Sequence, residues 1–222
     1  MRTVAVLPVK TFARAKQRLA EAVGSPDRRE LAGAMVGDVL EALGRVRGLD
    51  GLVAVTAEPR AAAAAREAGA HVVHDDREVG QSAAAALGVE AALGLGAERV
   101  LLVPGDCPAL DAGEVGALLA GDPAVGVLIV PDRHGSGTNA LLLTPPGAIE
   151  PSFGPGSFAR HAARGRAAGA VVRVAEIRSL SLDVDTPGDL EALKSALSAR
   201  PGGAARTRAL LERLLPAAAA AG

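Results

Sequence analysis

The fold of this chain is decided by residues 99–110, which read R-V-L-L-V-P-G-D-C-P-A-L. Residues 100–103 form an apolar run that is typical of a strand buried on both faces in a parallel sheet. The run ends at Pro104, because proline removes a hydrogen-bond donor that a central strand needs. Asp106 follows closely, so we expect its carboxylate at the carboxyl end of a central strand, where open α/β sheets bind their ligands.

Asp106 has a second interpretation, as the cap of the following helix or turn. The next helical pattern begins better at Asp111, which leaves Asp106 without a capping role. We therefore expect Asp106 to bind a ligand or a metal ion. Its neighbour Cys107 is interpreted as a small buried residue.

Strand and helix patterns alternate on both sides of this stretch. Apolar runs predict strands over residues 3–8, 52–56, 70–73, 126–131, 138–144, 170–174 and 180–184. Helical spacing of apolar residues predicts helices over residues 13–23, 26–43, 59–68, 82–95, 112–119, 158–168 and 188–197. The alternation predicts an α/β fold with three layers and a mostly parallel central sheet. We expect one domain over residues 1–199, then a C-terminal helix and a flexible tail over residues 200–222.

The composition excludes several classes of protein. The 222 residues carry a net charge of −1, no Trp or Tyr and three Phe, so no nucleic-acid partner is expected. A single Cys excludes an internal disulfide and favours a cytoplasmic location. No apolar stretch free of charges and glycines is long enough to span a membrane, so no membrane partner is expected.

The first loop is a candidate anion site. The first strand ends at Pro8, and Lys10 precedes the predicted helix over residues 13–23, whose N-terminal amides would attract an anion. Lys16 and Arg18 add positive charge to this segment. Each basic residue taken alone could be solvated on a surface helix. The cluster as a whole favours a phosphate ligand.

Two later loops carry further polar residues. Residues 74–81 read H-D-D-R-E-V-G-Q, and we expect Asp75 and Glu78 to be solvated, while Gly80 lets a ligand approach the backbone at the start of a helix. Residues 153–157, F-G-P-G-S, lead into a helix with several cations. Glycines, a serine and cations at a helix N-terminus predict an anion pocket there.

Asp183 and Asp185 follow the last predicted strand, so acids are expected at two strand ends. Asp185 could instead cap the next helix, and Asp183 could face solvent. Carboxylates that converge repel one another unless a divalent cation lies between them. Mg²⁺ is commonly held by one or two carboxylates together with substrate phosphates. This pattern predicts attack of a phosphate on the α-phosphorus of a nucleoside triphosphate, without a covalent nucleophile.

Five segments carry a resemblance to a known family. They are V-L-P-V-K-T-F-A-R-A-K-Q-R-L (6–19), V-P-G-D-C-P-A-L (103–110), P-D-R-H-G-S-G-T-N-A-L (131–141), F-G-P-G-S-F-A-R-H (153–161) and L-D-V-D-T-P-G-D-L (182–190). In this order they resemble the guanylyltransferases of coenzyme F420 biosynthesis, which act on phosphoenolpyruvate or 2-phospho-L-lactate. The resemblance implies a nucleotidyltransferase fold, similar to that of the molybdenum-cofactor guanylyltransferases. It also implies a reaction in which GTP and a phosphorylated three-carbon acid give a guanylylated product and pyrophosphate, with Mg²⁺ as cofactor.

The resemblance also implies roles for single residues. Lys16, Asp106 and Asp185 match the catalytic positions, and Asp106 and Asp185 match the metal ligands, with Asp183 as the competing second ligand. The positions expected to bind the phospho-acid are Thr138, Gly154 and Ser157, and those expected to bind the nucleotide are Pro8, Lys10, Lys16, Arg18 and Gly80. Ser82 departs from the family pattern, because an asparagine is common at this position. The departure concerns the recognition of the guanine base.

Other functions remain as alternatives at this point. The same fold could serve another acceptor, such as a molybdopterin or a sugar phosphate, or form a nucleotide-binding module without catalysis. The compact segment over residues 153–161 favours a small acceptor, and the bacterial-looking composition favours phosphoenolpyruvate over 2-phospho-L-lactate. We further expect a downstream F420-pathway transferase as a partner. The sequence does not determine the oligomeric state, and a homodimer is one alternative.

Overall fold

The computed structural model describes residues 1–13, 15–20 and 23–214, and its centre is a seven-stranded sheet with the order β3-β2-β1-β4-β6-β5-β7. The strands are β1 (Thr3–Val9), β2 (Gly51–Thr56), β3 (His71–Val73), β4 (Arg99–Leu102), β5 (Val127–Pro131), β6 (Thr138–Leu143) and β7 (Val172–Val174). Strand β6 runs antiparallel to its neighbours β4 and β5, and the other strand pairs are parallel. The mostly parallel sheet is thus confirmed, and β4 lies between β1 and β6 as the buried central strand.

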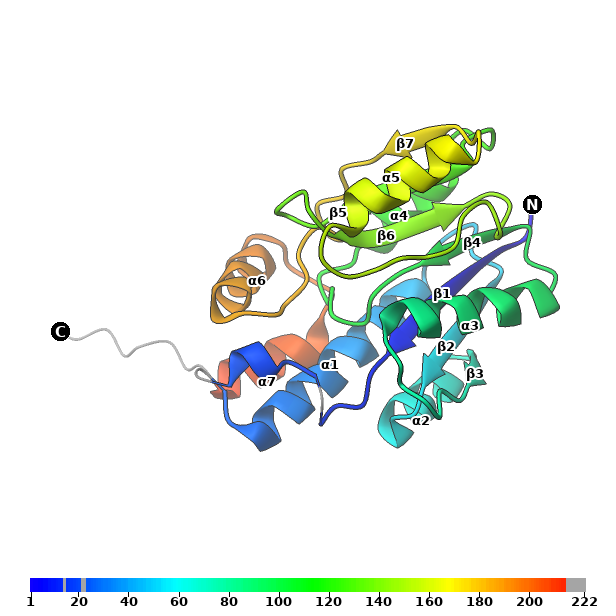
Figure 1. Ribbon diagram of the computed structural model, residues 1–222. Helices are drawn as coiled ribbons and strands as arrows, with labels where there is room; N and C mark the ends of the chain where they lie inside the picture. The colour runs from blue at the N-terminus through cyan, green and yellow to red at the C-terminus, as the bar shows by residue number, and fades with distance from the viewer. Residues whose placement is uncertain (14, 21–22, 215–222) are drawn as a thin grey trace.

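The helices are α1 (Ser25–Leu43), α2 (Pro59–Glu67), α3 (Gln81–Gly94), α4 (Ala112–Leu119), α5 (Ser157–Ala167), α6 (Pro187–Ala199) and α7 (Ala205–Leu214). Helices α1, α2 and α4 cover one face of the sheet, and α3 and α5 cover the other (Figure 1). Successive residues of β1 point to opposite faces, because side chains alternate along a strand. Ala5 and Leu7 belong to the first core, and Val4 and Val6 belong to the second. The predicted three-layer α/β fold is therefore confirmed.

One glycine sets the distance between α3 and the sheet. A Cβ atom at Gly88 would lie 2.2 Å from Cγ1 of Val6 and 3.0 Å from Cγ2 of Val55. Only glycine fits there without a shift of the helix, because core atoms are closely packed. The close approach brings the N-terminus of α3 to the carboxyl end of the sheet.

Helices α6 and α7 form a smaller third cluster with α1. Its buried side chains include Leu31, Met35, Leu190, Leu193 and Leu210. The predicted C-terminal helix thus packs against the rest of the chain, beside α1 (Figure 1). The predicted flexible tail from Pro216 lies outside the described residues. No helix within the described part of the chain is long and apolar enough to cross a membrane.

The predicted helix over residues 13–23 is wrong in its described part. Only a short 3-10 turn, Gln17–Leu19, is present, and Lys16 before it has a left-handed conformation with φ of 57°. A residue in this conformation cannot continue a right-handed helix. The chain therefore turns at Lys16 and directs this side chain inward.

The predicted strand over residues 180–184 is also wrong. Both edges of β4 are already paired, with β1 and β6, so no place beside it remains in the sheet. The segment instead crosses the carboxyl end of β4, where the Val184 backbone N–H donates to the Asp106 carbonyl oxygen at 3.2 Å. Its acids still arrive beside Asp106, although they do not follow a strand.

Candidate active site

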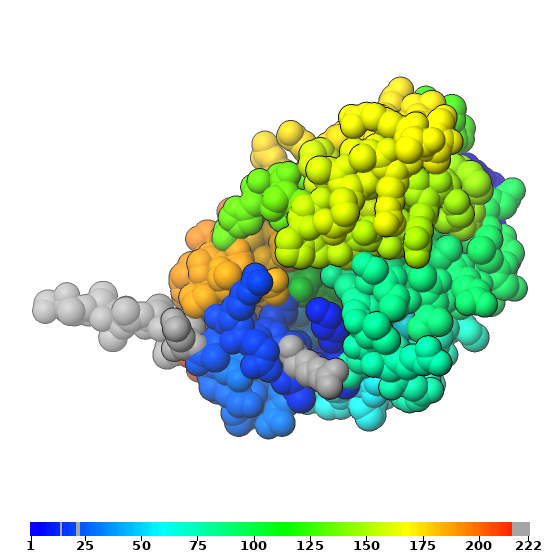
Figure 2. All heavy atoms as spheres, viewed as in Figure 1, coloured from blue at the N-terminus to red at the C-terminus, as the bar shows by residue number. Residues whose placement is uncertain are grey.

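A cleft of about 340 Å³ opens at the carboxyl ends of β1 and β4. Figure 2 shows the hollow, bordered by blue residues that follow β1, by the green region of α3 and by yellow residues of α5. The residues that line it include seven of the predicted site residues, namely Pro8, Lys10, Lys16, Arg18, Gly80, Asp106 and Asp185. Segments that are far apart in the sequence thus share one cavity.

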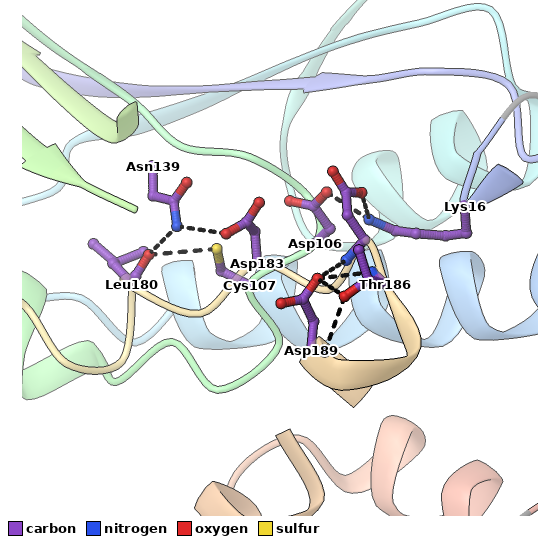
Figure 3. A network of polar contacts seen from close by, with 9 residues as sticks. Lys16, Asp106, Cys107, Asn139, Leu180, Asp183, Thr186 and Asp189 are labelled. Carbon is purple, nitrogen blue, oxygen red and sulfur yellow. Dashed lines mark hydrogen bonds and ion pairs between the residues drawn. The ribbon is translucent and has the colours of Figure 1, made fainter. Parts of the chain in front are cut away.

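Lys16 lies between two carboxylates at the floor of the cleft (Figure 3). Its Nζ atom donates to Oδ2 of Asp106 at 2.6 Å and to Oδ1 of Asp185 at 3.1 Å. The Lys16 side chain is only 5% exposed. Burial on its own lowers the pKa of Lys16, but the Asp106 and Asp185 carboxylates outweigh it, so the pKa lies above its ordinary value. Lys16 is therefore a fixed positive charge at neutral pH.

Asp106 uses only half of its carboxylate within the protein. Its Oδ1 atom is buried and has no hydrogen-bond partner among the described residues. A buried acceptor without a partner is costly unless a ligand satisfies it. The orphaned oxygen therefore fits a bound cation.

Asp183 belongs to the same group of acids. Its Oδ1 accepts from Asn139 Nδ2 at 3.1 Å, and the same amide donates to the Leu180 carbonyl oxygen at 2.8 Å. Burial, and then the charge of Asp106, raise the pKa of Asp183. Lys16, Asp106, Asp183 and Asp185 are called the acid–lysine cluster below.

Asp185 is not needed as a helix cap. Thr186 caps α6 in a reciprocal capping box with Asp189, in which the two residues bind each other's backbone and side chain. Asp185 is instead 46% exposed and directed to Lys16. In the same way, the Asp111 side chain accepts from Glu114 N at 2.8 Å and caps α4, so Asp106 has no capping role.

The described residues contain no group of three or more His, Cys, Asp or Glu side chains that could hold a metal ion on their own. Mg²⁺ does not require such a cage, because substrate phosphates and waters complete its shell. Cys107 is fully buried as predicted, and burial raises the pKa of its thiol well above the ordinary value. It therefore remains a neutral packing residue.

The predicted phospho-acid residues lie beside the cleft rather than in its lining. Thr138 is buried at the start of β6, and the next residue, Asn139, reaches Asp183. Gly154 and Ser157 belong to the segment over residues 152–157, which is called the acceptor loop below. The Thr138 Oγ1 atom lies 3.0 Å from Nδ1 of His161 on α5 and so joins β6 to this region.

Two of the three arginines of α5, Arg160 and Arg164, are already engaged with the protein. Arg160 donates to the backbone carbonyl oxygens of Ser152 at 3.0 Å and of Phe153 at 3.2 Å, and it also contacts the Pro155 carbonyl oxygen. Arg164 donates to the Glu150 carbonyl oxygen at 2.8 Å. These two guanidinium groups hold the acceptor loop and its approach in place.

The prediction that Asp75 and Glu78 are solvated is wrong. Asp75 is only 8% exposed, and its Oδ1 accepts from Glu78 N at 3.0 Å. The Glu78 carboxylate accepts from the Thr11 backbone N–H at 2.8 Å, and Glu58 accepts from the Phe12 N–H at 3.0 Å. The acidic loop is therefore joined to the first loop through Glu78, while Asp75 stabilises the acidic loop itself.

Three residues with a place in the site were missed in the prediction. Asn139 stands beside Thr138 in G-T-N-A-L, and His161 ends F-G-P-G-S-F-A-R-H, so both lie within quoted motifs. Asp75 has no signal of its own, because its burial depends on the packing of its loop. Ser82 accepts from Phe153 N at 2.9 Å and connects the first turn of α3 to the acceptor loop.

The fold and the cleft define a nucleotidyltransferase-like protein. A protein described as a nucleotide-diphospho-sugar transferase from Desulfovibrio desulfuricans has 20% identity and a TM-score of 0.71, over 96% of this chain and 99% of that chain. A CMP:2-keto-3-deoxy-manno-octonic acid synthetase solved with CTP has 17% identity and a TM-score of 0.61, over 90% of this chain and 99% of that chain. At these identities the likeness shows the fold alone.

The sequence comparison is more specific. The chain belongs to the family described as CofC-like guanylyl transferases, whose model matches residues 3–196. A phosphoenolpyruvate guanylyltransferase of Conexibacter woesei is 50% identical over 97% of both chains. One from Sphaerobacter thermophilus is 42% identical over 87% of this chain and 93% of the relative. The resemblance stated from the motifs is thus confirmed at the level of the family.

Proposed function

We propose that this protein transfers GMP from GTP to phosphoenolpyruvate and releases pyrophosphate, as a step in coenzyme F420 biosynthesis. The observation that carries the proposal is the acid–lysine cluster at the floor of the cleft, where Lys16 joins Asp106 and Asp185. The membership of the CofC-like family and the names of the relatives support the choice of nucleotide and acceptor.

The reaction needs positioning and charge neutralisation more than proton transfer. A phosphate oxygen of the acceptor forms a bond to the α-phosphorus of GTP, and the bond between that phosphorus and the bridging oxygen to the β-phosphate breaks. Pyrophosphate leaves with the electron pair. Because the attacking phosphate is already an anion, no general base is required. Lys16 stays protonated and stabilises negative charge that develops on the triphosphate.

Mg²⁺ is proposed as the cofactor. Oδ1 of Asp106 is the first candidate ligand, because it is buried without a partner. Asp185 and Asp183 are candidates for the second, since both lie in the acid–lysine cluster. When bound, the ion would neutralise charge on the phosphates and orient the α-phosphate.

Asp75 supports guanine as the base. It lines the cleft, it is almost fully buried, and its Oδ1 accepts from the Glu78 backbone N–H at 3.0 Å, which fixes the carboxylate in the loop. Guanine presents two adjacent N–H donors, N1–H and the 2-amino group, which one carboxylate accepts together. Adenine presents an acceptor at N1, which the carboxylate would repel. We therefore propose Asp75 as the residue that favours GTP.

An assay with defined acceptors tests the proposed function. The protein is incubated with GTP and Mg²⁺, either alone or with phosphoenolpyruvate, 2-phospho-L-lactate or a sugar phosphate. Pyrophosphate release is followed, and the product is identified by mass spectrometry. We expect release with phosphoenolpyruvate and none without an acceptor. Release only with another acceptor, or GTP binding without turnover, would overturn the proposal.

A further inference from the structure

Helix α5, which follows the acceptor loop, contains a buried histidine, His161, that has no assigned role. His161 is 0% exposed and makes a hydrogen bond with each of its ring nitrogens. Nε2 lies 2.8 Å from the Ser152 backbone nitrogen, and Nδ1 lies 3.0 Å from Oγ1 of Thr138. The Phe153 ring packs against the imidazole edge-on, with centroids 5.2 Å apart at 74°.

These two contacts fix the tautomer of His161. A backbone N–H can only donate, so Nε2 must accept from Ser152 and carry no hydrogen. The neutral ring then has its hydrogen on Nδ1, and this N–H donates to Oγ1 of Thr138. The contact of Nε2 with the Ser152 N–H thus determines that Nδ1 is the donor to Thr138.

The tautomer in turn decides the direction of the Thr138 hydroxyl. Its oxygen already accepts from His161, and its own hydrogen has no acceptor among the described residues. Thr138 is 7% exposed, so its hydroxyl has little access to solvent. A buried hydroxyl hydrogen that lacks an acceptor in the protein is suited to donate to an anionic oxygen of a ligand.

His161 also fixes the acceptor loop relative to β6. The loop amides of Ser152 and Phe153 are bound by His161 and Ser82, while Arg160 binds their carbonyl oxygens. The same imidazole therefore holds both sides of the region in which a phospho-acid is expected, Thr138 on β6 and the loop before α5.

We propose that His161 is a positioning residue for the acceptor, which turns the Thr138 hydroxyl into a donor to an oxygen of the phosphorylated three-carbon acid. This inference rests on the proposed function, because it assumes that acceptor. His161 does not touch the reacting atoms and acts through Thr138 and Ser152.

Two amide variants separate the two contacts of the ring. His161→Asn keeps a donor near the Nδ1 position for Thr138, and His161→Gln keeps an acceptor near the Nε2 position for Ser152. The donor to Thr138 is the one that matters for the acceptor. We expect His161→Gln to raise the KM for phosphoenolpyruvate by about tenfold or more, and His161→Asn to raise it less. The KM for GTP should change by less than about twofold in both.

A double-mutant cycle with Thr138→Val tests whether His161 acts through the hydroxyl. Thr138→Val removes the hydroxyl at nearly constant volume, and His161→Gln should add little to the acceptor KM in that background. Additive effects of the two changes, or equal increases in the KM for GTP, would overturn the proposal. Melting temperatures of all variants identify any that fail to fold.

A measurement without turnover keeps this proposal separate from the proposed function. The ¹⁵N and ¹H NMR signals of His161 in the wild-type protein report which ring nitrogen is protonated. We expect the hydrogen on Nδ1, and a shift of that signal on addition of phosphoenolpyruvate that Thr138→Val abolishes. A hydrogen on Nε2, or the same shift in Thr138→Val, would overturn the inference. Absence of pyrophosphate release by the wild-type protein would instead contradict the proposed function.

Discussion

The ammonium of Lys16 lies 2.6 Å from Oδ2 of Asp106, and the other oxygen of that carboxylate is buried without a partner. The two residues are 90 positions apart in the chain. Lys16 thus occupies one oxygen of the Asp106 carboxylate, and the other oxygen remains available to a ligand. A cation and a triphosphate together would complete this arrangement, because each supplies the charge that the other lacks.

Replacement of Asp106 should stop the reaction without unfolding the protein. Asp106→Asn keeps the shape of the side chain but removes the charge that pairs with Lys16 and with a metal ion. We expect pyrophosphate release to fall by at least about 100-fold, with a far-UV circular dichroism spectrum like that of the wild type. Turnover near the wild-type rate in this variant would count against the proposed mechanism.

Removal of Lys16 should make the site bind a divalent cation more strongly. In Lys16→Met the Asp106 and Asp185 carboxylates lose the ammonium that lies between them, and a metal ion then relieves their repulsion. We expect Mg²⁺ alone to raise the melting temperature of Lys16→Met more than that of the wild type, while activity is lost. The extra response should vanish in Lys16→Met combined with Asp106→Asn, and its survival there would contradict a site at Asp106.

Asp75 should set the preference for the base. Asp75→Asn keeps an acceptor for Glu78 N but presents an N–H to the base, which complements the 2-oxo group of xanthine. We expect kcat/KM to fall by about tenfold or more for GTP and to rise for XTP. An unchanged ratio of the two nucleotides would show that Asp75 does not contact the base.

We expect the free energy of unfolding to decrease at acidic pH because His161 is buried in its neutral form. Its pKa is lowered to about 4, first by burial and then by the charges of Arg160 and Arg164. A histidine in the unfolded chain titrates at about pH 6.5, so between these two values the unfolded state binds more protons. The contribution of His161 is thus fully present above about pH 6.5 and is lost as the pH falls towards 4.

Urea denaturation at a series of pH values measures this effect. We expect the free energy of unfolding of the wild type to fall over that pH window, and the fall to be smaller in His161→Gln. Parallel pH profiles for the two proteins would show that other groups cause the acid sensitivity.

The approach of α3 to the sheet should be sensitive to one methyl group. Gly88→Ala places a Cβ at 2.2 Å from Cγ1 of Val6, so the helix must shift, and we expect a loss of about 1–3 kcal/mol in the free energy of unfolding. The KM for GTP should rise as well, because the N-terminus of α3 borders the cleft. Gly94→Ala is the matched control, since no atom lies within 4 Å of a Cβ at that position. Equal stability of the two variants would contradict the packing argument.

Local patterns predicted much of the fold. The apolar run before Pro104 gave the central strand, and Asp111 gave the correct start of α4. These signals are local, because proline, capping residues and apolar periodicity act within a few residues of themselves. The predicted helix over residues 13–23 was wrong because the chain turns at Lys16, which has a left-handed conformation. The predicted strand over residues 180–184 was wrong because both edges of β4 are already paired.

By itself the sequence determined the alternation of strands and helices, the family and the set of residues from which a site could be built. Only the tertiary structure decided that Lys16 lies between Asp106 and Asp185, that Asp75 is buried, and that His161 connects Thr138 to Ser152. The physical reason is distance along the chain. Contacts between residues 90 or 169 positions apart depend on strand order and loop packing, which no local pattern encodes.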